Sequence, residues 1–374
     1  MKKKLQLIDL VRTFCILSVM AQHLGVHYRP EVQTWGAQLW EVYASKGAYG
    51  VSLFFVISGF LITRLIDTNL GGLSKPRLMA FYGRRLARIV PLLLVVMVVG
   101  VVFLWALPNE GQPDMTFRGA QVSFNFVFFL SILTFTFNWL VVFKEFIFHQ
   151  SFYGLYWVVL WSLSIEEQFY LVYPLVLKYL KPRSWLPFCL IGAVVLGLGS
   201  RWWVYLNDPT NFHLGLLNSF SGFEEIAIGV TLYLASKRYQ KFLSKNKTVP
   251  TLLFVSGTLL LAVLYSQTLY PVDFIWEPTL LAGALFLLLL GGLNLEFFES
   301  PWLKPFAYPG KISYGMYLWH ALVLFLAGGF IFRFDTFFSF AVFIFLTITL
   351  GSLSYYLFEL PMNRWVRKLV EKTW

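Results

Sequence analysis

Long apolar runs alternate with short polar and basic segments along the whole chain. Eleven runs can be distinguished, at 7–24, 47–66, 89–107, 121–143, 155–177, 184–205, 213–235, 249–267, 275–293, 312–332 and 336–358. Most have close to the roughly 20 residues that a helix needs to cross a bilayer core. The pattern therefore predicts an all-α fold, a polytopic transmembrane helical bundle.

Lysine and arginine gather between these runs and indicate which runs cross. The clusters lie at 2–4, 75–88, 178–183, 237–247, 304–311 and 364–372. Cytoplasmic loops carry an excess of these residues, and placing every cluster on that side requires an even number of crossings between clusters. We therefore expect about ten spans with both termini cytoplasmic, and 121–143, interrupted by Asn125 and Asn138, does not cross. An alternative with eleven spans would place one terminus outside.

Composition supports a membrane protein. Of the 374 residues, 58% are hydrophobic and only 13% charged, whereas a soluble domain has about 25% charged residues. We therefore treat 1–374 as a single integral-membrane domain and expect no separate soluble domain within it. The net charge of +11 sits in loops between apolar runs, which indicates membrane topology rather than a nucleic-acid partner.

The cysteines, the histidines and the N-terminus bear on whether the chain has disulfides, a metal site or a cleaved signal peptide. Cys15 and Cys189 both lie in apolar runs, so neither a disulfide framework nor a zinc site is expected. His23 and His27 have the i, i+4 spacing of helical zinc ligands, but the other histidines are scattered, and we expect no metal. The basic N-terminus resembles a signal peptide, yet no small-residue cleavage site follows Ala21. We therefore expect 7–24 to be a retained span.

The first span carries three ionisable residues, Asp9, Arg12 and His23. Each costs about 2.5–3.5 kcal/mol at the centre of a span, so such residues are functional candidates. Arg12 and His23 are close to three helical turns apart and share a face, about 16 Å apart along the axis. Asp9 can pair with Arg12. The alternative is that Arg12 reaches the interface and His23 caps the helix.

Two further segments combine small, aromatic and basic residues. The run 49–62 mixes Gly and Ser with Phe, which permits close helix packing. Arg84, Arg85 and Arg88 stand where the third span begins, and guanidinium groups suit phosphate ligands. The alternative for the arginines is ordinary anchoring at the cytoplasmic interface.

Carboxylates occur inside two other apolar runs. Glu166 and Glu167 lie near the middle of one run, and Glu224 and Glu225 lie in another. A buried carboxyl group can act as an acid or base or orient a histidine, or it can simply join helices by a hydrogen bond or ion pair. Either Arg12 or Arg201 could neutralise Glu224 and Glu225.

The last two runs contain a polar stripe and a proline. Ser313, Tyr317 and His320, at i, i+4 and i+7, form a stripe on one helical face, although such stripes often only bond helices together. Pro361 is expected to end the last helix, with Glu359 at the interface.

Five blocks in chain order resemble the membrane-bound acyltransferase-3 family, whose bacterial members O-acetylate lipopolysaccharide, exopolysaccharide, nodulation factors and some macrolides. The blocks are Arg12-x10-His23, the Gly-Val-x-Leu-Phe-Phe run at 50–60, Arg85-x-x-Arg88 before Pro91, the Trp-Ser-Leu block at 161–170 and the Ile-Ser-Tyr-Gly block at 312–320. They extend over nearly the whole chain. The resemblance implies ten spans and a bacterial inner membrane.

The resemblance also implies acetyl-CoA as the acyl donor and a carbohydrate or glycolipid as the acceptor. On this hypothesis Arg84, Arg85 and Arg88 hold the nucleotide and pyrophosphate. His23 acts as general base at the outer side, or less favourably carries the acyl group, with Arg12 and Glu166 as its catalytic partners. A transporter or flippase of a carbohydrate or lipid-linked substrate remains the alternative function, because intramembrane Glu, Arg and His also serve as relays. A non-catalytic scaffold would leave the cost of these residues unexplained.

Overall fold

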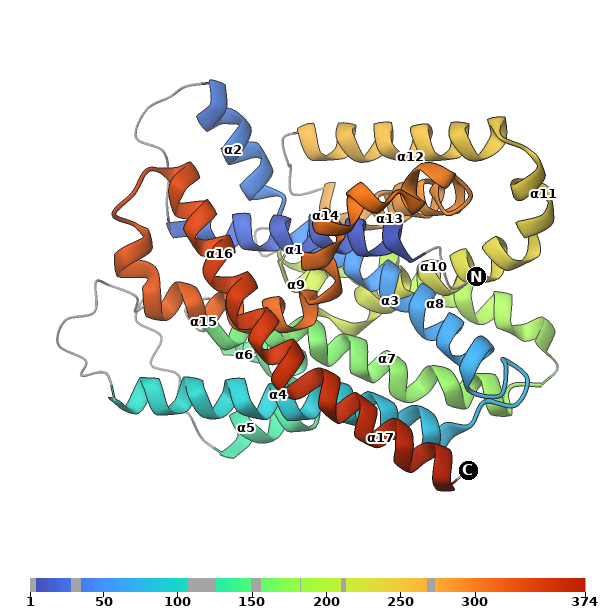
Figure 1. Cartoon of the computed structure of the whole chain (residues 1–374), viewed down its shortest axis with the longest axis horizontal. Coiled ribbons are helices and arrows are strands. Elements are labelled where there is room, and N and C mark those ends of the chain that lie inside the picture. The colour runs from blue at the N-terminus through green and yellow to red at the C-terminus, as the bar shows by residue number, and fades with distance from the viewer. Residues whose placement is uncertain are drawn as a thin grey trace.

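The computed structural model describes residues 5–27, 35–106, 126–148, 156–181, 183–209, 213–267 and 273–373, and these ranges are helical with no strand among them (Figure 1). The α-helices are α1 (Gln6–His27), α2 (Trp35–Ser45), α3 (Ala48–Asn69), α4 (Leu78–Ala106), α5 (Phe126–Leu133), α6 (Phe137–Phe148), α7 (Leu160–Tyr179), α8 (Leu186–Asn207), α9 (His213–Leu217), α10 (Ser219–Arg238), α11 (Gln240–Lys245), α12 (Thr248–Ser266), α13 (Asp273–Gly292), α14 (Lys304–Lys311), α15 (Ser313–Ile331), α16 (Thr336–Ser354) and α17 (Leu360–Thr373). The predicted all-α fold is confirmed.

Eight described helices are long and apolar enough to cross a membrane, namely α1, α3, α4, α8, α12, α13, α15 and the helix that begins with α16. Two more, α7 and α10, are each 20 residues long but carry the two pairs of glutamates. The run 121–143 contains α5 and the first part of α6, helices of 8 and 12 residues, and each is shorter than the roughly 20 residues that a span needs. The number of ten spans and the cytoplasmic termini stay predictions.

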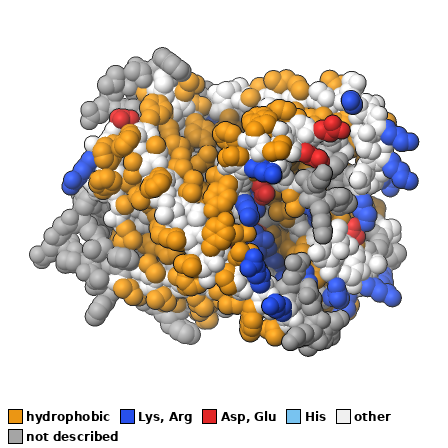
Figure 2. All heavy atoms as spheres, viewed as in Figure 1, with side chains coloured by type: hydrophobic (Ala, Val, Ile, Leu, Met, Phe, Trp, Pro, Cys, Tyr) orange, Lys and Arg blue, Asp and Glu red, His pale blue; other side chains and the backbone are white. Residues whose placement is uncertain are grey.

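Five of the six segments predicted to be cytoplasmic gather at one end of the bundle, whereas the sixth, 304–311, forms α14 near the middle of Figure 1. The start of α1, the turn between α3 and α4, the end of α7, helix α11 and the end of α17 all lie on the right-hand side of Figure 1. Lys and Arg side chains concentrate on the same side in Figure 2, while the left part of that face is largely hydrophobic. We call this the basic end of the bundle.

Burial separates central helices from peripheral ones. In the most apolar window of α3, 72% of the residues are buried inside the protein, compared with 17% in α8 and in α12. The exposed side chains of α8 and α12 include Phe188, Ile191 and Leu259, as expected for surfaces that contact lipid acyl chains. Helix α3 therefore lies at the centre and is surrounded by the helices that form the site.

Helices α3 and α10 approach each other so closely that their backbones are nearly in contact. A Cβ atom on Gly59 would lie 1.9 Å from the carbonyl oxygen of Ile226, and one on Gly229 would lie 1.9 Å from the carbonyl oxygen of Val56. Small residues allow this approach in membranes, where packing replaces the hydrophobic effect as the driving force. The run at 49–62 therefore serves close helix packing, as the sequence predicts.

The expectation that the last helix ends at Pro361 is wrong. A single π-helical turn, Tyr355–Glu359, joins α16 directly to α17, and Pro361 is the second residue of α17. Proline has no N–H group to donate within the helix, and the wider π turn before it, in which the Leu360 N–H donates to the Tyr355 carbonyl oxygen, is the kind of local adjustment that accommodates such a break in the hydrogen-bond ladder. The side chain of Glu359, the last residue of the π turn, is buried inside the protein, and its place at the membrane interface stays a prediction.

Candidate functional site

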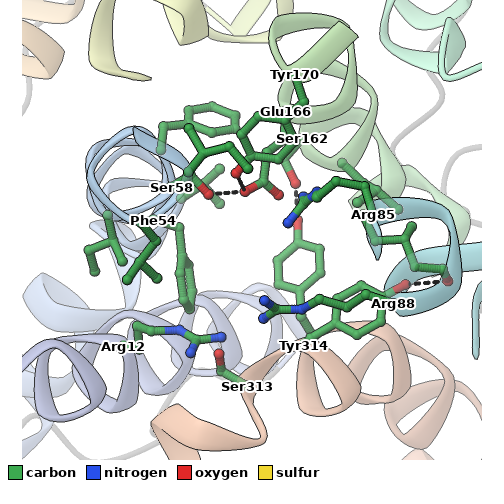
Figure 3. A pocket seen from close by; sticks show the side chains of 18 of the residues that line it. Arg12, Phe54, Ser58, Arg85, Arg88, Ser162, Glu166, Tyr170, Ser313 and Tyr314 are labelled. Carbon is green, nitrogen blue, oxygen red and sulfur yellow. Dashed lines mark hydrogen bonds between the residues drawn. The ribbon is translucent and has the colours of Figure 1, made fainter. Parts of the chain in front are cut away.

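An elongated cavity of about 280 Å³ runs between α1, α3, α4, α7 and α15 (Figure 3). Its wall on α3 extends from Val51 to Leu65, a length of about 21 Å along the helix axis. Most of the wall is apolar. The lining residues are Arg12, Val51, Phe54, Phe55, Ile57, Ser58, Leu61, Ile62, Leu65, Arg85, Arg88, Ile89, Ser162, Leu163, Glu166, Tyr170, Ser313, Tyr314, Tyr317 and Leu318.

Three guanidinium groups line the part of the cavity nearest the basic end, those of Arg12, Arg85 and Arg88. Figure 3 shows Arg12 and Arg88 directed into the central space from one side, with Glu166 on the other. Arg12 also lies 3.6 Å from Asp9, which confirms the predicted i, i+3 pair. No ion pair among the described residues includes Arg88. This end of the cavity is suited to an anionic ligand.

Helix α4 is long, and its arginines lie in its first half. It has 29 residues, or about 43 Å of helix, against a bilayer core of about 30 Å. The helix is therefore longer than a bilayer core is thick. Arg88 lies about 15 Å along the helix from Leu78, and the backbone carbonyl of the next residue, Ile89, accepts a hydrogen bond from Tyr314.

Arg85 is held by α7 rather than left open to a ligand. Its guanidinium group donates to Glu167 at 2.7 Å, with both side chains largely buried. It also lies 4.0 Å from the centre of the Tyr170 ring, a cation–π geometry. Arg85 and Glu167 therefore form a buried pair between α4 and α7. The sequence did not reveal this pair, because its members are 82 positions apart.

Glu166 is the carboxylate of the cavity. One of its oxygen atoms, Oε1, accepts hydrogen bonds from the hydroxyl groups of Ser58 and Tyr170. These two donors fix the carboxylate in the cavity wall opposite Arg12 and Arg88. Tyr170 follows Glu166 by four residues, so helical spacing could have identified it. Ser58 comes from α3, and no sequence signal links it to Glu166.

Tyr317 lines the cavity from α15. Its hydroxyl group donates to the backbone carbonyl of Val159 at 2.7 Å and lies 2.6 Å from the Ser162 hydroxyl. Ser313 and Tyr317 of the predicted polar stripe thus line the cavity, whereas His320 does not. His320 lies one turn farther from the basic end than Met316 and is fully buried.

His23 lies outside the lining of the cavity, in contact with His320. The centres of the two imidazole rings are 5.0 Å apart, and the rings meet edge to face. His23 itself does not line the cavity, whereas Arg12, on the same helix, does. The structure therefore separates the predicted first-span site into a charged part at Arg12 and a histidine part about 16 Å farther along α1.

The remaining predicted residues lie elsewhere. Arg84 precedes the lining residue Arg85 in the chain but does not itself line the cavity. Glu224 forms a buried ion pair with Arg201 at 2.7 Å, which confirms one of the two proposed partners. Arg201 also donates to Ser221 at 2.6 Å and Thr279 at 2.8 Å. This second group of polar residues therefore joins α8, α10 and α13 to one another.

The described residues include no group of three or more His, Cys, Asp and Glu side chains that could hold a metal ion. The His27 side chain lies outside the described part, so the His23 and His27 pair is not tested. The absence of a metal stays a prediction.

Comparison with known proteins gives one family and a set of relatives. The model of the family described as "Acyltransferase domain" matches residues 5–357. The chain is 29% identical over 341 residues to the peptidoglycan O-acetyltransferase OatA of Listeria monocytogenes, covering 85% of this chain and 49% of that protein. It is 26% identical over 379 residues to the O-acetyltransferase OatA of Staphylococcus aureus, covering 96% of this chain and 57% of that protein. The chain thus spans about half the length of these relatives. No solved structure matches it.

Proposed function

The chain belongs to the acyltransferase family that matches it over residues 5–357, and from this premise we propose that it is a membrane O-acetyltransferase. The donor is acetyl-CoA at the basic, cytoplasmic end. The acceptor is a hydroxyl group of a cell-envelope carbohydrate at the opposite, outer end, and the name of the Listeria relative favours a peptidoglycan glycan. The membrane is the inner membrane of a bacterium.

The observation that carries this proposal is the shape and polarity of the cavity. Acetyl-CoA has an anionic nucleotide part joined to a thin, largely uncharged pantetheine arm that ends in the thioester. The cavity has Arg12 and Arg88 toward the basic end and a mostly apolar wall for about 21 Å along α3. Arginine binds phosphate oxygens through paired hydrogen bonds. The arm would extend along the apolar wall and bring the thioester toward Tyr317 and the histidines.

The proposed chemistry is direct transfer with His23 as general base. His23 takes the proton from the acceptor hydroxyl as its oxygen attacks the thioester carbonyl carbon. The carbon–sulfur bond breaks, and CoA leaves as the thiolate. Protonated His23 then returns the proton to that sulfur, so the products are the O-acetyl ester and CoA thiol. No water or covalent enzyme intermediate is required.

Glu166 and Arg12 support this reaction from within the cavity. Glu166 is fixed by Ser58 and Tyr170 and is the only carboxylate among the lining residues. Its negative charge attracts the guanidinium groups of Arg12 and Arg88 on the opposite wall. It also repels phosphate groups from its own wall, so the anionic part of the donor stays beside the arginines and the arm extends along the cavity. A transporter would also need charged groups here, but the family match favours acyl transfer.

The test uses the purified full chain in detergent with acetyl-CoA labelled in its acetyl group and soluble peptidoglycan oligosaccharides. We expect label on the oligosaccharide as an alkali-labile ester. His23→Ala should lower the rate by about 100- to 10,000-fold, the usual contribution of a general base, and should retain acetyl-CoA binding. His27→Ala, one turn along the same helix, is the matched control and should stay active. Retained transfer in His23→Ala would remove His23 from the mechanism.

A further inference from the structure

His320 is a buried histidine in which one ring nitrogen atom makes a hydrogen bond and the other makes none with the described residues. Its Nδ1 atom lies 2.6 Å from the backbone carbonyl oxygen of Tyr317. A carbonyl oxygen only accepts hydrogen bonds, so Nδ1 must carry the hydrogen, and the neutral ring then has its lone pair on Nε2. Nε2 is buried and has no hydrogen-bond partner among the described residues. His320 therefore presents an unused acceptor inside the bundle.

The surroundings of His320 fix its ring in place. It is fully buried, and its ring centre lies 5.3 Å from that of Tyr317. Tyr317 is itself held by Ser162 and the carbonyl of Val159. Tyr317 also lines the cavity. His320 therefore lies on the same helix, α15, as a residue that contacts the proposed donor site.

The His320 ring also contacts the ring of His23. The two ring centres are 5.0 Å apart in an edge-to-face arrangement, although the residues come from the first and the penultimate apolar runs of the chain. A buried polar nitrogen without a partner costs free energy, on the order of 1–3 kcal/mol. Such a cost is accepted most readily where the group acts during the reaction.

We propose that His320 is the positioning residue for His23. It holds the His23 ring by direct contact and offers Nε2 as an acceptor for an N–H group of His23. This inference rests on the proposed function, because it assumes that His23 is the base. A base oriented by a third group is the usual arrangement in nucleophile activation. In this protein the orienting group is a second histidine held by a backbone carbonyl.

The effect on the reaction follows from the proton balance. When His23 takes the proton of the acceptor hydroxyl, it becomes an imidazolium ion with two N–H groups. Nε2 of His320 accepts a hydrogen bond from one of them, and the proton itself stays on His23 until it passes to the CoA sulfur. His320 thus stabilises the protonated base without changing its own protonation state.

The test compares two substitutions of His320 and one control substitution of Trp319 in the full chain, with acetyl transfer from labelled acetyl-CoA to peptidoglycan oligosaccharides as the readout. His320→Phe keeps a ring against His23 but removes both nitrogen atoms. His320→Gln keeps an acceptor oxygen and a donor for the Tyr317 carbonyl. Trp319→Phe, a similar loss in a buried neighbour that packs into the core cluster around Phe128 and Phe137, is the matched control. Acetyl-CoA binding and monodispersity in detergent establish that each variant is folded.

We expect kcat of His320→Phe to fall by up to about 100-fold, the cost of a misplaced catalytic group, with KM for acetyl-CoA unchanged. His320→Gln should recover part of kcat, and Trp319→Phe should resemble the wild type. A purely structural role would instead raise KM or lower the yield of all three variants together. The inference is overturned if His320→Phe retains the wild-type kcat, or if the Gln and Phe variants lose activity equally. Absence of transfer by the folded wild-type protein would overturn the proposed function itself.

Discussion

At the scale of single residues, Arg85 and Arg88 differ in what already holds them, although both line the cavity. Arg85 is paired with Glu167 and lies over Tyr170. Arg88 has no ion-pair partner among the described residues. We therefore assign Arg88, together with Arg12, the larger share of donor binding, and Arg85 a role in joining α4 to α7.

Substitution of Arg88 should weaken donor binding without unfolding the protein. A hydrogen bond to a charged group contributes about 1.5–3 kcal/mol, so Arg88→Ala should raise the Kd for acetyl-CoA by about 10- to 100-fold. Arg88→Lys should recover only part of the affinity, because a point charge replaces a planar fork. Equilibrium binding of labelled acetyl-CoA to purified protein measures both.

The control is Lys75→Ala, at an exposed position in the turn before α4. It removes one positive charge from the basic end without touching the cavity. If Lys75→Ala and Arg88→Ala weaken binding alike, the arginines act only through the general positive charge of this end, and the donor site is wrong.

The Arg85 and Glu167 pair gives a different prediction, about stability. Breaking a buried pair leaves one charge uncompensated at a cost of about 3–5 kcal/mol; the slight exposure of both side chains places the effect toward the lower value. Arg85→Met alone and Glu167→Leu alone should therefore lower the thermal stability in detergent. The double variant should be more stable than either single variant, since it leaves no buried charge. Additive losses would show that the pair is not coupled.

At the scale of elements, the contact between α3 and α10 holds in place the helix, α3, that forms one wall of the cavity. Gly59→Ala places a methyl group against the Ile226 carbonyl oxygen, and overpacking of this kind costs about 1–3 kcal/mol. We expect a lower apparent Tm in detergent and a reduced rate of acetyl transfer, because α3 must shift away from α10 into the cavity.

Gly192→Ala on α8 is the matched control, because no atom lies within 4 Å of the added Cβ. Alanine favours a helix over glycine by about 1 kcal/mol, so this variant should be as stable as the wild type or slightly more so. Equal effects of the two substitutions would contradict the close approach of α3 and α10.

Local spacing was enough to predict some of these features. The Asp9 and Arg12 pair is three residues apart on one helix, and the apolar runs are long and uninterrupted, so both follow from helical geometry. The continuation of the last helix through Pro361 could not be foreseen, because the π turn that allows it depends on packing. The contact of His23 with His320, and of Arg85 with Glu167, required the tertiary arrangement of α1, α4, α7 and α15.

At the scale of the whole molecule, the trans-membrane mechanism depends on which ends of the helices face the cytoplasm. Single cysteines test this in a chain in which exposed Cys189 and buried Cys15 are replaced by serine or alanine. An impermeant thiol reagent added to intact cells should label cysteines at Asn207 and Gln267, at the ends of α8 and α12. It should label those at Lys75 and Lys241, at the basic end, only after permeabilisation.

Lys181 is the informative further position in this experiment. It follows α7, and ten spans place it on the cytoplasmic side, whereas a crossing of the run 121–143 would place it outside. External labelling at Lys75 would be more damaging, because the arginines at the basic end would then face away from cytosolic acetyl-CoA.

The central claim is that an acetyl group passes through the bundle from the basic end to the histidine end. The direct measurement uses proteoliposomes that enclose labelled acetyl-CoA, with peptidoglycan oligosaccharides, which cannot cross the membrane, only outside. We predict ester-linked label on the external oligosaccharides with the wild-type protein, a rate lowered by about 100-fold or more with His23→Ala, and little change with His27→Ala. The account is contradicted if folded wild-type protein acetylates oligosaccharides only when donor and acceptor are on the same side of the membrane.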